Sequence, residues 1–220
     1  NKGRWGMGPE IFTPENARIY GTWLGRRYAQ SDVIWIMGGD RALENAGQLE
    51  IVRAMAEGIR STDTGSHLMG FHPPGGESSS TWVHCESWLD FHAIQSGHAR
   101  DRENYDMIER DRRRLPVRPC VEMEPGYEDH PNGFNVEKGW LDQHDVRRSC
   151  WWAFCAGAGG YTYGCHDVWQ MFSDHQPVVN LARRHWTEAL ALPGAGQVHH
   201  ARRLFESRPY ASRVPDQELI

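Results

Sequence analysis

The sequence lacks long hydrophobic runs and an excess of basic residues. No stretch of about 18 apolar residues occurs, whereas a membrane-spanning helix needs about 20. Lys and Arg together number 24, against 29 Asp and Glu, which gives a formal net charge of −5. We therefore expect no nucleic-acid partner and no insertion into a membrane. The oligomeric state cannot be inferred from these features.

Cysteine is also sparse, and its spacing is not that of a metal site. The five cysteines contain no C-x-x-C pair, and their odd number is not a disulfide framework. Twelve histidines occur, but without H-x-H or H-E-x-x-H they more often hydrogen-bond than bind a metal. We expect no metal and no cofactor. The cysteines are expected to be buried free thiols: Cys85, Cys120, Cys150, Cys155 and Cys165.

Short hydrophobic runs alternate with helical patterns along the whole chain. Such alternation predicts βα units around a parallel sheet, in one α/β domain spanning residues 1–220. Thr13-Pro14-Glu15 is a typical helix start, with a hydroxyl cap followed by proline. We predict helices at about 14–30, 48–59, 104–114 and 145–156, and buried strands at 33–37, 67–72, 88–95, 116–124 and 159–164.

Polar residues follow the predicted strands where each strand ends. In a (β/α)₈ barrel the active site lies at the carboxyl ends of the strands. A doubly wound sheet would instead favour a glycine-rich phosphate turn, and no G-x-G-x-x-G is present. The pattern therefore favours a barrel. The strand-end residues are Asp40, His72, Gln95 with His98, Glu124 and His166.

Two carboxyl groups are needed to cleave a glycosidic bond, one as an acid and one as a nucleophile or base. Asp40 follows Gly38-Gly39, which let the chain turn sharply and present the carboxyl group; the alternative is an aspartate that caps the next helix. Glu124 ends a strand before a proline. Glu122 lies two residues earlier and should face the same side. Spacing alone therefore leaves both glutamates as candidates.

Several segments together resemble the apiosidase-like glycoside hydrolases. No single segment is specific, but jointly they extend over nearly the whole chain. The chain departs from the family pattern at Met123, His92 and Cys165, which puts the substrate in more doubt than the reaction. The similar segments are Ile34 to Arg41, Trp88 to Phe91 with Gln95 to His98, Glu124 to Pro131, Tyr161 to Gly164, Val168 to Met171, Ala189 to Ala195, and Ser207 to Gln217.

The resemblance implies a (β/α)₈ barrel that releases apiose-containing units from the pectic polysaccharide rhamnogalacturonan II. It implies that Asp40 is the acid/base and Glu124 the nucleophile of a retaining mechanism, with carboxyl groups about 5 to 5.5 Å apart. The alternative is a non-catalytic carbohydrate-binding or structural barrel module. Arg41 would hold the Asp40 loop or lie free on the surface. The expected sugar-binding residues are His72, Gln95, His98, Tyr127, Tyr163 and His166, with Trp169 or Trp82 as a stacking face.

By the same resemblance, the chain matches only strands four to eight of the barrel. We expect an open, truncated barrel in which Trp35 or nearby apolar residues are exposed. We expect the isolated chain to be inactive and poorly soluble, because unpaired strand edges promote aggregation. The family's polysaccharide substrate favours a secreted or periplasmic protein.

Overall fold

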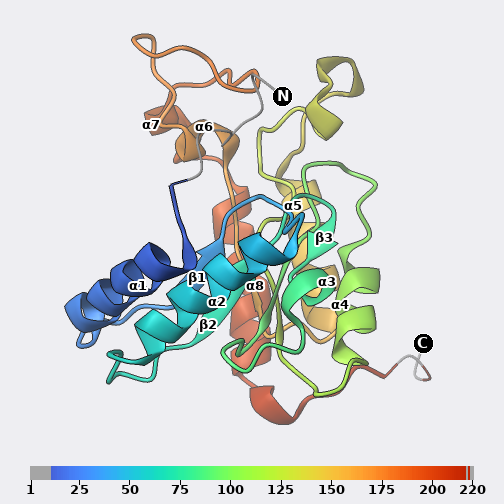
Figure 1. Ribbon diagram of the computed structural model, residues 1–220. Coiled ribbons are helices and arrows are strands. Elements are labelled where there is room, and N and C mark those ends of the chain that lie inside the picture. Colours follow the sequence, from blue (N-terminus) through green and yellow to red (C-terminus); the bar gives the residue numbers. More distant parts are fainter. Residues whose placement is uncertain (1–10, 217, 219–220) are drawn as a thin grey trace.

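The computed structural model describes residues 11–216 and 218, which form a mixed α/β fold (Figure 1). Strand β1 (Trp35–Gly38) pairs in parallel with β2 (Met69–His72). Strands β4 (His92–Gln95), β5 (Cys120–Glu122) and β6 (Gly160–Tyr161) pair in parallel in that order. All five predicted strands are therefore present, although each is shorter than the sequence suggested.

The strands form two sheets, and the described residues contain no closed barrel. The short strand β3 (Glu77–Ser78) was not predicted and pairs antiparallel with β4. No ladder joins β2 to β4. Instead, Asp90 connects them: Met69 N–H donates to Asp90 Oδ2 at 2.6 Å, and Asp90 N–H donates to the Met69 carbonyl at 2.8 Å.

The four predicted helices are confirmed to within a few residues. Helix α1 (Pro14–Tyr28) begins at Thr13, whose hydroxyl accepts from Asn16 N–H, while the Asn16 side chain accepts from Thr13 N–H. The other three are α2 (Ala46–Arg60), α4 (Asn104–Arg112) and α5 (Gln143–Cys155). The sequence did not predict α3 (Ser80–Val83), α6 (His166–Trp169), α7 (Trp186–Ala189), α8 (Gly194–Glu206) or the 3-10 turns η1 (Asn132–Phe134), η2 (Val136–Lys138) and η3 (Tyr210–Ser212).

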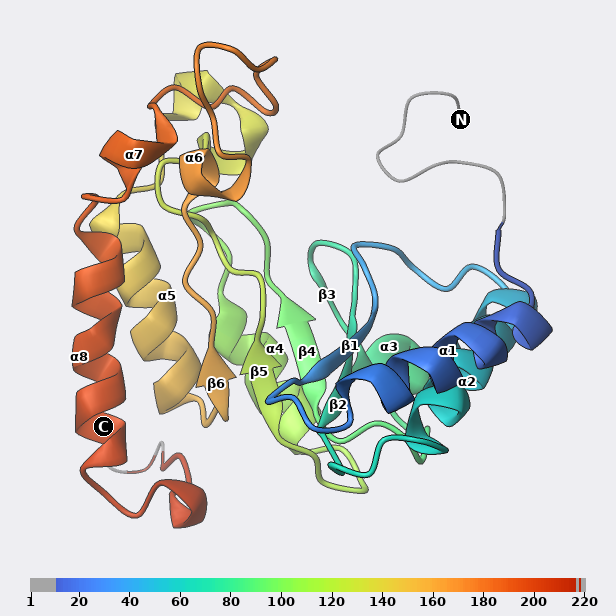
Figure 2. The ribbon, with the colours of Figure 1, turned by 90° about the vertical axis from the view of Figure 1, so that its left-hand side faces the viewer.

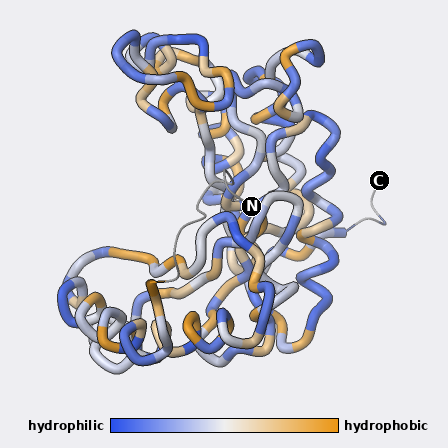
Figure 3. Tube along the Cα trace, turned by 45° about the horizontal axis from the view of Figure 1, so that its top comes forward, coloured by the Kyte–Doolittle hydropathy of each residue, from blue (hydrophilic) through white to orange (hydrophobic). Residues whose placement is uncertain are grey.

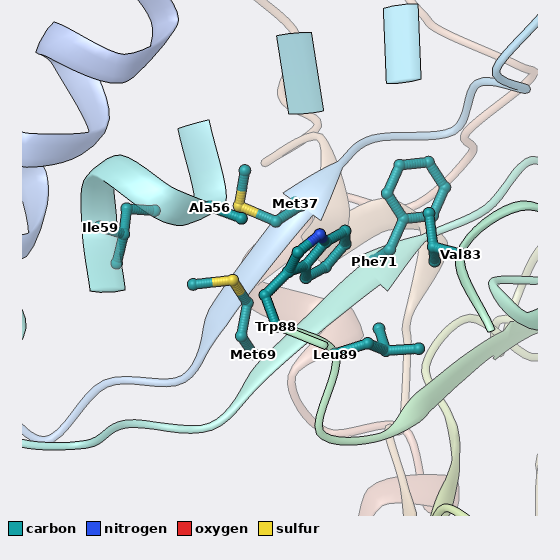
Figure 4. Packing of buried hydrophobic residues seen from close by; sticks show 8 residues of the cluster. All are labelled: Met37, Ala56, Ile59, Met69, Phe71, Val83, Trp88 and Leu89. Atoms are coloured by element: carbon teal, nitrogen blue, oxygen red, sulfur yellow. The ribbon is translucent and has the colours of Figure 1, made fainter. Parts of the chain in front are cut away.

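Figure 2 shows the strands side by side, with the pair α1 and α2 at one end of the row and the pair α5 and α8 at the other. A hydrophobic cluster fills the space between α2 and the β1–β2 sheet, and Figure 4 shows its buried members. A second cluster joins β4 and β5 to α4 and α5 through Ile94, Ile108, Cys120 and Ala153. These two clusters fix the strands from which the polar residues project.

Burial agrees with only part of the sequence-based expectation. All five cysteines are free, but Cys85 and Cys155 are exposed, so the expectation of five buried thiols was wrong for these two. Ile34, just before β1, is 59% exposed, whereas Trp35 is half-buried and donates to Asp63. No described helix is long and apolar enough to cross a membrane, and Figure 3 shows hydrophobic and hydrophilic stretches alternating along the trace.

Glycines allow α1 and α2 to pack closely. A side-chain carbon added at Gly58 of α2 would press against the carbonyl of Arg18 and the amide of Thr22 in α1. Gly21 of α1 would press in the same way on the carbonyl of Met55. The two helices are therefore in backbone contact, which only glycine permits at these positions.

We predict that Gly58→Ala lowers the free energy of unfolding by about 1–3 kcal/mol, because the helices must separate to admit the methyl group. Gly196→Ala in α8 is the matched control, since an added carbon there meets nothing within 4 Å. Alanine at position 196 should be neutral or stabilise by up to about 1 kcal/mol. Urea unfolding of the two variants makes the comparison, and equal stabilities would contradict the close packing.

Candidate active site

A left-handed turn after β1 exposes Asp40. Gly38, Gly39 and Asp40 have φ angles of 74°, 151° and 52°, a region that glycine adopts freely and aspartate tolerates. The Asp40 amide approaches His72 Nδ1 at 3.4 Å. The two glycines thus turn the chain so that Asp40 is solvent-exposed beside the end of β2.

Glu124 lies just after β5 and is held between two histidines. His72 Nε2, from the end of β2, is 3.0 Å from Glu124 Oε2. His98 Nε2, from the turn after β4, is 3.2 Å from Glu124 Oε1. The other nitrogen of His98 faces the Pro125 carbonyl at 3.1 Å, so both ring nitrogens face acceptors.

The two histidines determine the charge of Glu124. Burial alone would raise the pKa of this carboxyl, but the hydrogen bonds from His72 and His98 outweigh it and lower the pKa to about 2. Burial likewise opposes protonation of His72, yet the Glu124 carboxylate raises the pKa of that imidazole. Glu124 is therefore a carboxylate at neutral pH, which is the form that can attack a carbon atom.

A pocket of about 440 Å³ brings most of the predicted site residues together. Asp40 and Glu124 both line it, while His72 reaches it through its contact with Glu124. Residues that the sequence analysis did not select also line the pocket. The predicted lining residues are Gln95, His98, Tyr127, His166 and Trp169, and the additional ones are Gly75, Gly76, Gly97, Arg102, His130, Phe134, Val179 and Asn180.

Glu122 does not face the pocket, contrary to the expectation from strand alternation. Its side chain is fully buried and is absent from the pocket lining. The alternation breaks because Met123 N–H and Glu124 N–H both donate to the Ile94 carbonyl, at 2.8 and 3.2 Å. Burial raises the pKa of Glu122 to about 7. A pKa of this kind suits a general acid, but Glu122 has no access to a bound sugar.

Three other expected residues have different surroundings. Tyr163 does not line the pocket, and its hydroxyl donates to Glu128 Oε2 at 2.5 Å. Trp82 packs against the core cluster beside Phe71, so it is not a sugar-stacking face. Arg41 has a buried Nη2 without a hydrogen-bond partner among the described residues, and it makes no contact that would hold the Asp40 loop.

Aromatic and histidine rings form a continuous series from Glu124 to the pocket rim. The His98 and His130 centroids are 4.4 Å apart, and those of His130 and His166 are 4.5 Å apart. The His166 ring is nearly parallel to Trp169, which is 47% exposed. Burial and the neighbouring histidines lower the pKa of His130 to about 3, so this ring is neutral. Trp169 therefore offers a flat face at the end of a rigid series of rings.

The segment from 170 to 185 contributes Val179 and Asn180 to the pocket lining. Hydrogen bonds within the segment and ion pairs to Asp129 hold it in place. Gln170 Nε2 donates to the Val179 carbonyl at 2.9 Å, and Val179 N–H donates to Gln170 Oε1 at 3.0 Å. Arg183 and Arg184 both pair with the buried Asp129. Val179 and Asn180 consequently face the pocket from a fixed position.

One group of side chains in the described residues has the spacing of a cation site. Ligand atoms of Asp142, His144 and Asp145 lie within 4.8 Å of one another. Asp142 caps α5, however, and Asp145 pairs with Arg100 at 2.9 Å. Because both carboxylates already have these partners, we assign no metal to this group.

Comparisons with known proteins identify the fold. A solved structure described as "Glycoside hydrolase" is 32% identical, with a TM-score of 0.88 over 94% of this chain and 50% of that chain. A glycoside hydrolase family 5 structure from Bacteroides vulgatus ATCC 8482 is 35% identical, with a TM-score of 0.89 over 95% and 48%. The fold is thus that of glycoside hydrolase structures. This chain spans about half the length of each.

A family model described as the apiosidase-like catalytic domain matches residues 1–212. The chain therefore belongs to the apiosidase-like family. Among curated proteins, no sequence matches it.

We predict that His98→Gln raises the pKa of the Glu124 carboxyl above about 2, because one of the two hydrogen-bonding imidazoles is lost. The Glu124 carboxylate stabilises the fold above the pKa that it has in the unfolded chain, and this stability is lost as the pH falls through its lower pKa in the folded state. Because the substitution raises the folded pKa, the pH range over which the stability is lost should move upward. A carbon-13 NMR titration of the carboxyl measures the shift. His144→Gln, at an exposed histidine, should leave the Glu124 titration where it was.

Proposed function

We propose that this chain is part of a retaining glycoside hydrolase, with Glu124 as nucleophile and Asp40 as acid/base. The observation that carries the proposal is the Glu124 carboxyl, held by two histidines in a pocket that Asp40 also lines. Glycoside cleavage needs two carboxyl groups around one bond. In a retaining enzyme these groups lie about 5 to 5.5 Å apart.

In the first step, Asp40 gives its proton to the leaving oxygen while the Glu124 carboxylate bonds to the anomeric carbon. In the second step, Asp40 takes a proton from water, the water oxygen bonds to the same carbon, and Glu124 is released. His72 and His98 orient the Glu124 oxygens throughout. Gln95, Tyr127 and His166 bind sugar hydroxyls, and Trp169 stacks on a ring face.

The architecture that we propose is a (β/α)₈ barrel, of which this chain supplies strands four to eight. In this assignment β1, β2, β4, β5 and β6 are those strands, and β3 is an insertion. Two observations support it. The similar solved structures are about twice the length of this chain, and both β1 and β6 have an unpaired edge among the described residues.

We propose a pectic polysaccharide as the substrate, and Arg102 supports this. Arg102 lines the pocket and is exposed, and it takes part in none of the ion pairs found among the described residues. Pectic chains are rich in uronic acids, whose carboxylates pair well with arginine. Gln95 lines the same pocket, is 4% exposed, and has a buried Oε1 without a protein partner.

Glu124→Gln in the complete protein should reduce kcat by at least about a thousandfold while substrate still binds, because an amide cannot attack the anomeric carbon. Asp40→Asn should slow poor leaving groups about 10² to 10⁴-fold and activated aryl glycosides much less, since the latter need little protonation. Steady-state kinetics on both substrate types measures this. Glu137→Gln, an exposed control, should behave as wild type. An active Glu124→Gln would refute the assignment.

Arg102→Met should raise KM about tenfold for an oligosaccharide that carries a uronate, because a charge-assisted hydrogen bond is lost. The same oligosaccharide with its carboxyl reduced to an alcohol is the matched control substrate, and its KM should change little. Arg26→Met, at an exposed arginine of α1, serves as the control variant. An equal rise in KM for the two substrates would show that Arg102 does not recognise a carboxylate.

A further inference from the structure

Phe134, in the turn η1, has a backbone conformation that phenylalanine rarely adopts. Its φ is 62°, directly after Gly133 at 63°. In this left-handed region the Cβ of an L-residue crowds the following carbonyl, so glycine accepts the conformation freely and a bulky side chain is strained. Strained residues persist where their surroundings hold them in place, and they are concentrated at functional sites.

The Phe134 ring is also poorly buried. Its side chain is 55% exposed, and it belongs to none of the hydrophobic clusters formed by the described residues. Its ring lies nearly perpendicular to that of His130, at 4.6 Å between centroids, and it approaches His98 at 5.8 Å. A strained backbone that presents a half-exposed aromatic ring adds little to the stability of the fold.

Hydrogen bonds hold this turn against the turn that carries His98. Gly133 N–H donates to the His98 carbonyl at 2.7 Å. The Asn132 side chain accepts from Arg100 N–H at 2.9 Å. The Phe134 ring is therefore in place before any ligand arrives, and a residue that is already ordered lowers the entropic cost of binding.

The position of the ring relates it to the active site. Phe134 lines the same pocket as Asp40 and Glu124. It lies at one end of the ring series that passes through His130 and His166 and ends at Trp169. The pocket thus has an exposed aromatic side chain at each end of this series.

Two other large hydrophobic residues share the strain and the exposure but not this position. Met171 and Leu181 are exposed and have φ angles of 49° and 65°. Neither of them lines the pocket. Strain and exposure alone therefore do not distinguish Phe134, and its place in the pocket does.

We propose that Phe134 is a second sugar-stacking residue, whose exposed ring packs against the C–H face of one sugar unit of the substrate. Aromatic rings combine a large apolar surface with little conformational freedom, which suits them to this contact. The inference rests on the proposed function in taking a carbohydrate as the ligand. The strained backbone at Phe134 is then kept for binding and not for stability.

Thermal unfolding of the complete protein tests the cause of the strain. Phe134→Asn removes the ring and places a residue that tolerates the left-handed region, so Tm should stay the same or rise by about 2–4 °C. Leu181→Asn makes the same kind of change outside the pocket and should behave alike. A fall in Tm of more than about 4 °C in Phe134→Asn would show that the ring stabilises the fold and would overturn the proposal.

Calorimetric titration with a pectic trisaccharide that contains a uronate tests binding. The complete protein carries Glu124→Gln in every titration, so that the sugar is not cleaved. Adding Phe134→Asn should raise Kd about tenfold, because a stacking contact is lost. Phe134→Tyr should restore Kd to within about twofold, and Leu181→Asn should not change it. An unchanged Kd in Phe134→Asn, or an equal rise in Leu181→Asn, would refute the stacking role.

Cleavage by the wild-type protein is measured separately, so the two proposals can fail independently. If the protein binds the trisaccharide without cleaving it, a tenfold weaker Phe134→Asn complex still supports the stacking role. If the protein cleaves it and Phe134→Asn binds as tightly as its parent, the stacking role is wrong and the proposed function stands. No binding of the trisaccharide by the Glu124→Gln protein would also overturn the inference.

Discussion

The negative charge of Glu124 is partly buried, and its partners come from two different sheets. His72 belongs to the end of β2, whereas Glu124 and His98 follow β5 and β4. No backbone ladder joins β2 to β4, so the carboxylate and its imidazoles connect the sheets at their carboxyl ends. Asp90 makes the corresponding connection at the other end, through Met69 and Arg60. The pocket therefore depends on a polar interaction that also determines how the two sheets meet.

Two glutamates separated by a single residue illustrate how surroundings control ionisation. Glu124 receives two imidazoles, and its pKa falls to about 2. Glu122 receives a backbone amide and is otherwise enclosed, so its pKa rises to about 7. Glu122 and Glu124 thus differ in charge because the chain leaves its regular strand geometry between them.

The sequence predicted the strands and four helices because buried strands and amphipathic helices have distinct hydrophobic periods. It also placed Asp40, His72, His98 and Glu124 at strand ends. It could not predict that Glu122 turns away, because the irregular pairing to Ile94 leaves no local pattern. Helix α8 was missed because it begins at Gly194 without a capping side chain, and its first amide is bound by the distant Glu128. The sequence also gave no sign that Tyr163 lies outside the pocket, because its hydroxyl donates to the same distant residue, Glu128.

The pocket wall at Val179 and Asn180 is held mostly by contacts within its own region, but His166 Nε2 lies 2.9 Å from the Asn180 carbonyl and joins the wall to the rings beside His98. Gln170 holds Val179, and Asp129 holds Arg183 and Arg184. None of these residues contacts Glu124, His72 or His98 through a described hydrogen bond or ion pair. A change at Asn180 can therefore reach the histidines beside Glu124 through His166, whereas the contacts of Gln170 and Asp129 do not touch them. Among the described residues of this segment, Val179 and Asn180 line the pocket, so residues 171–178 could vary in sequence and length while the pocket lining stays the same.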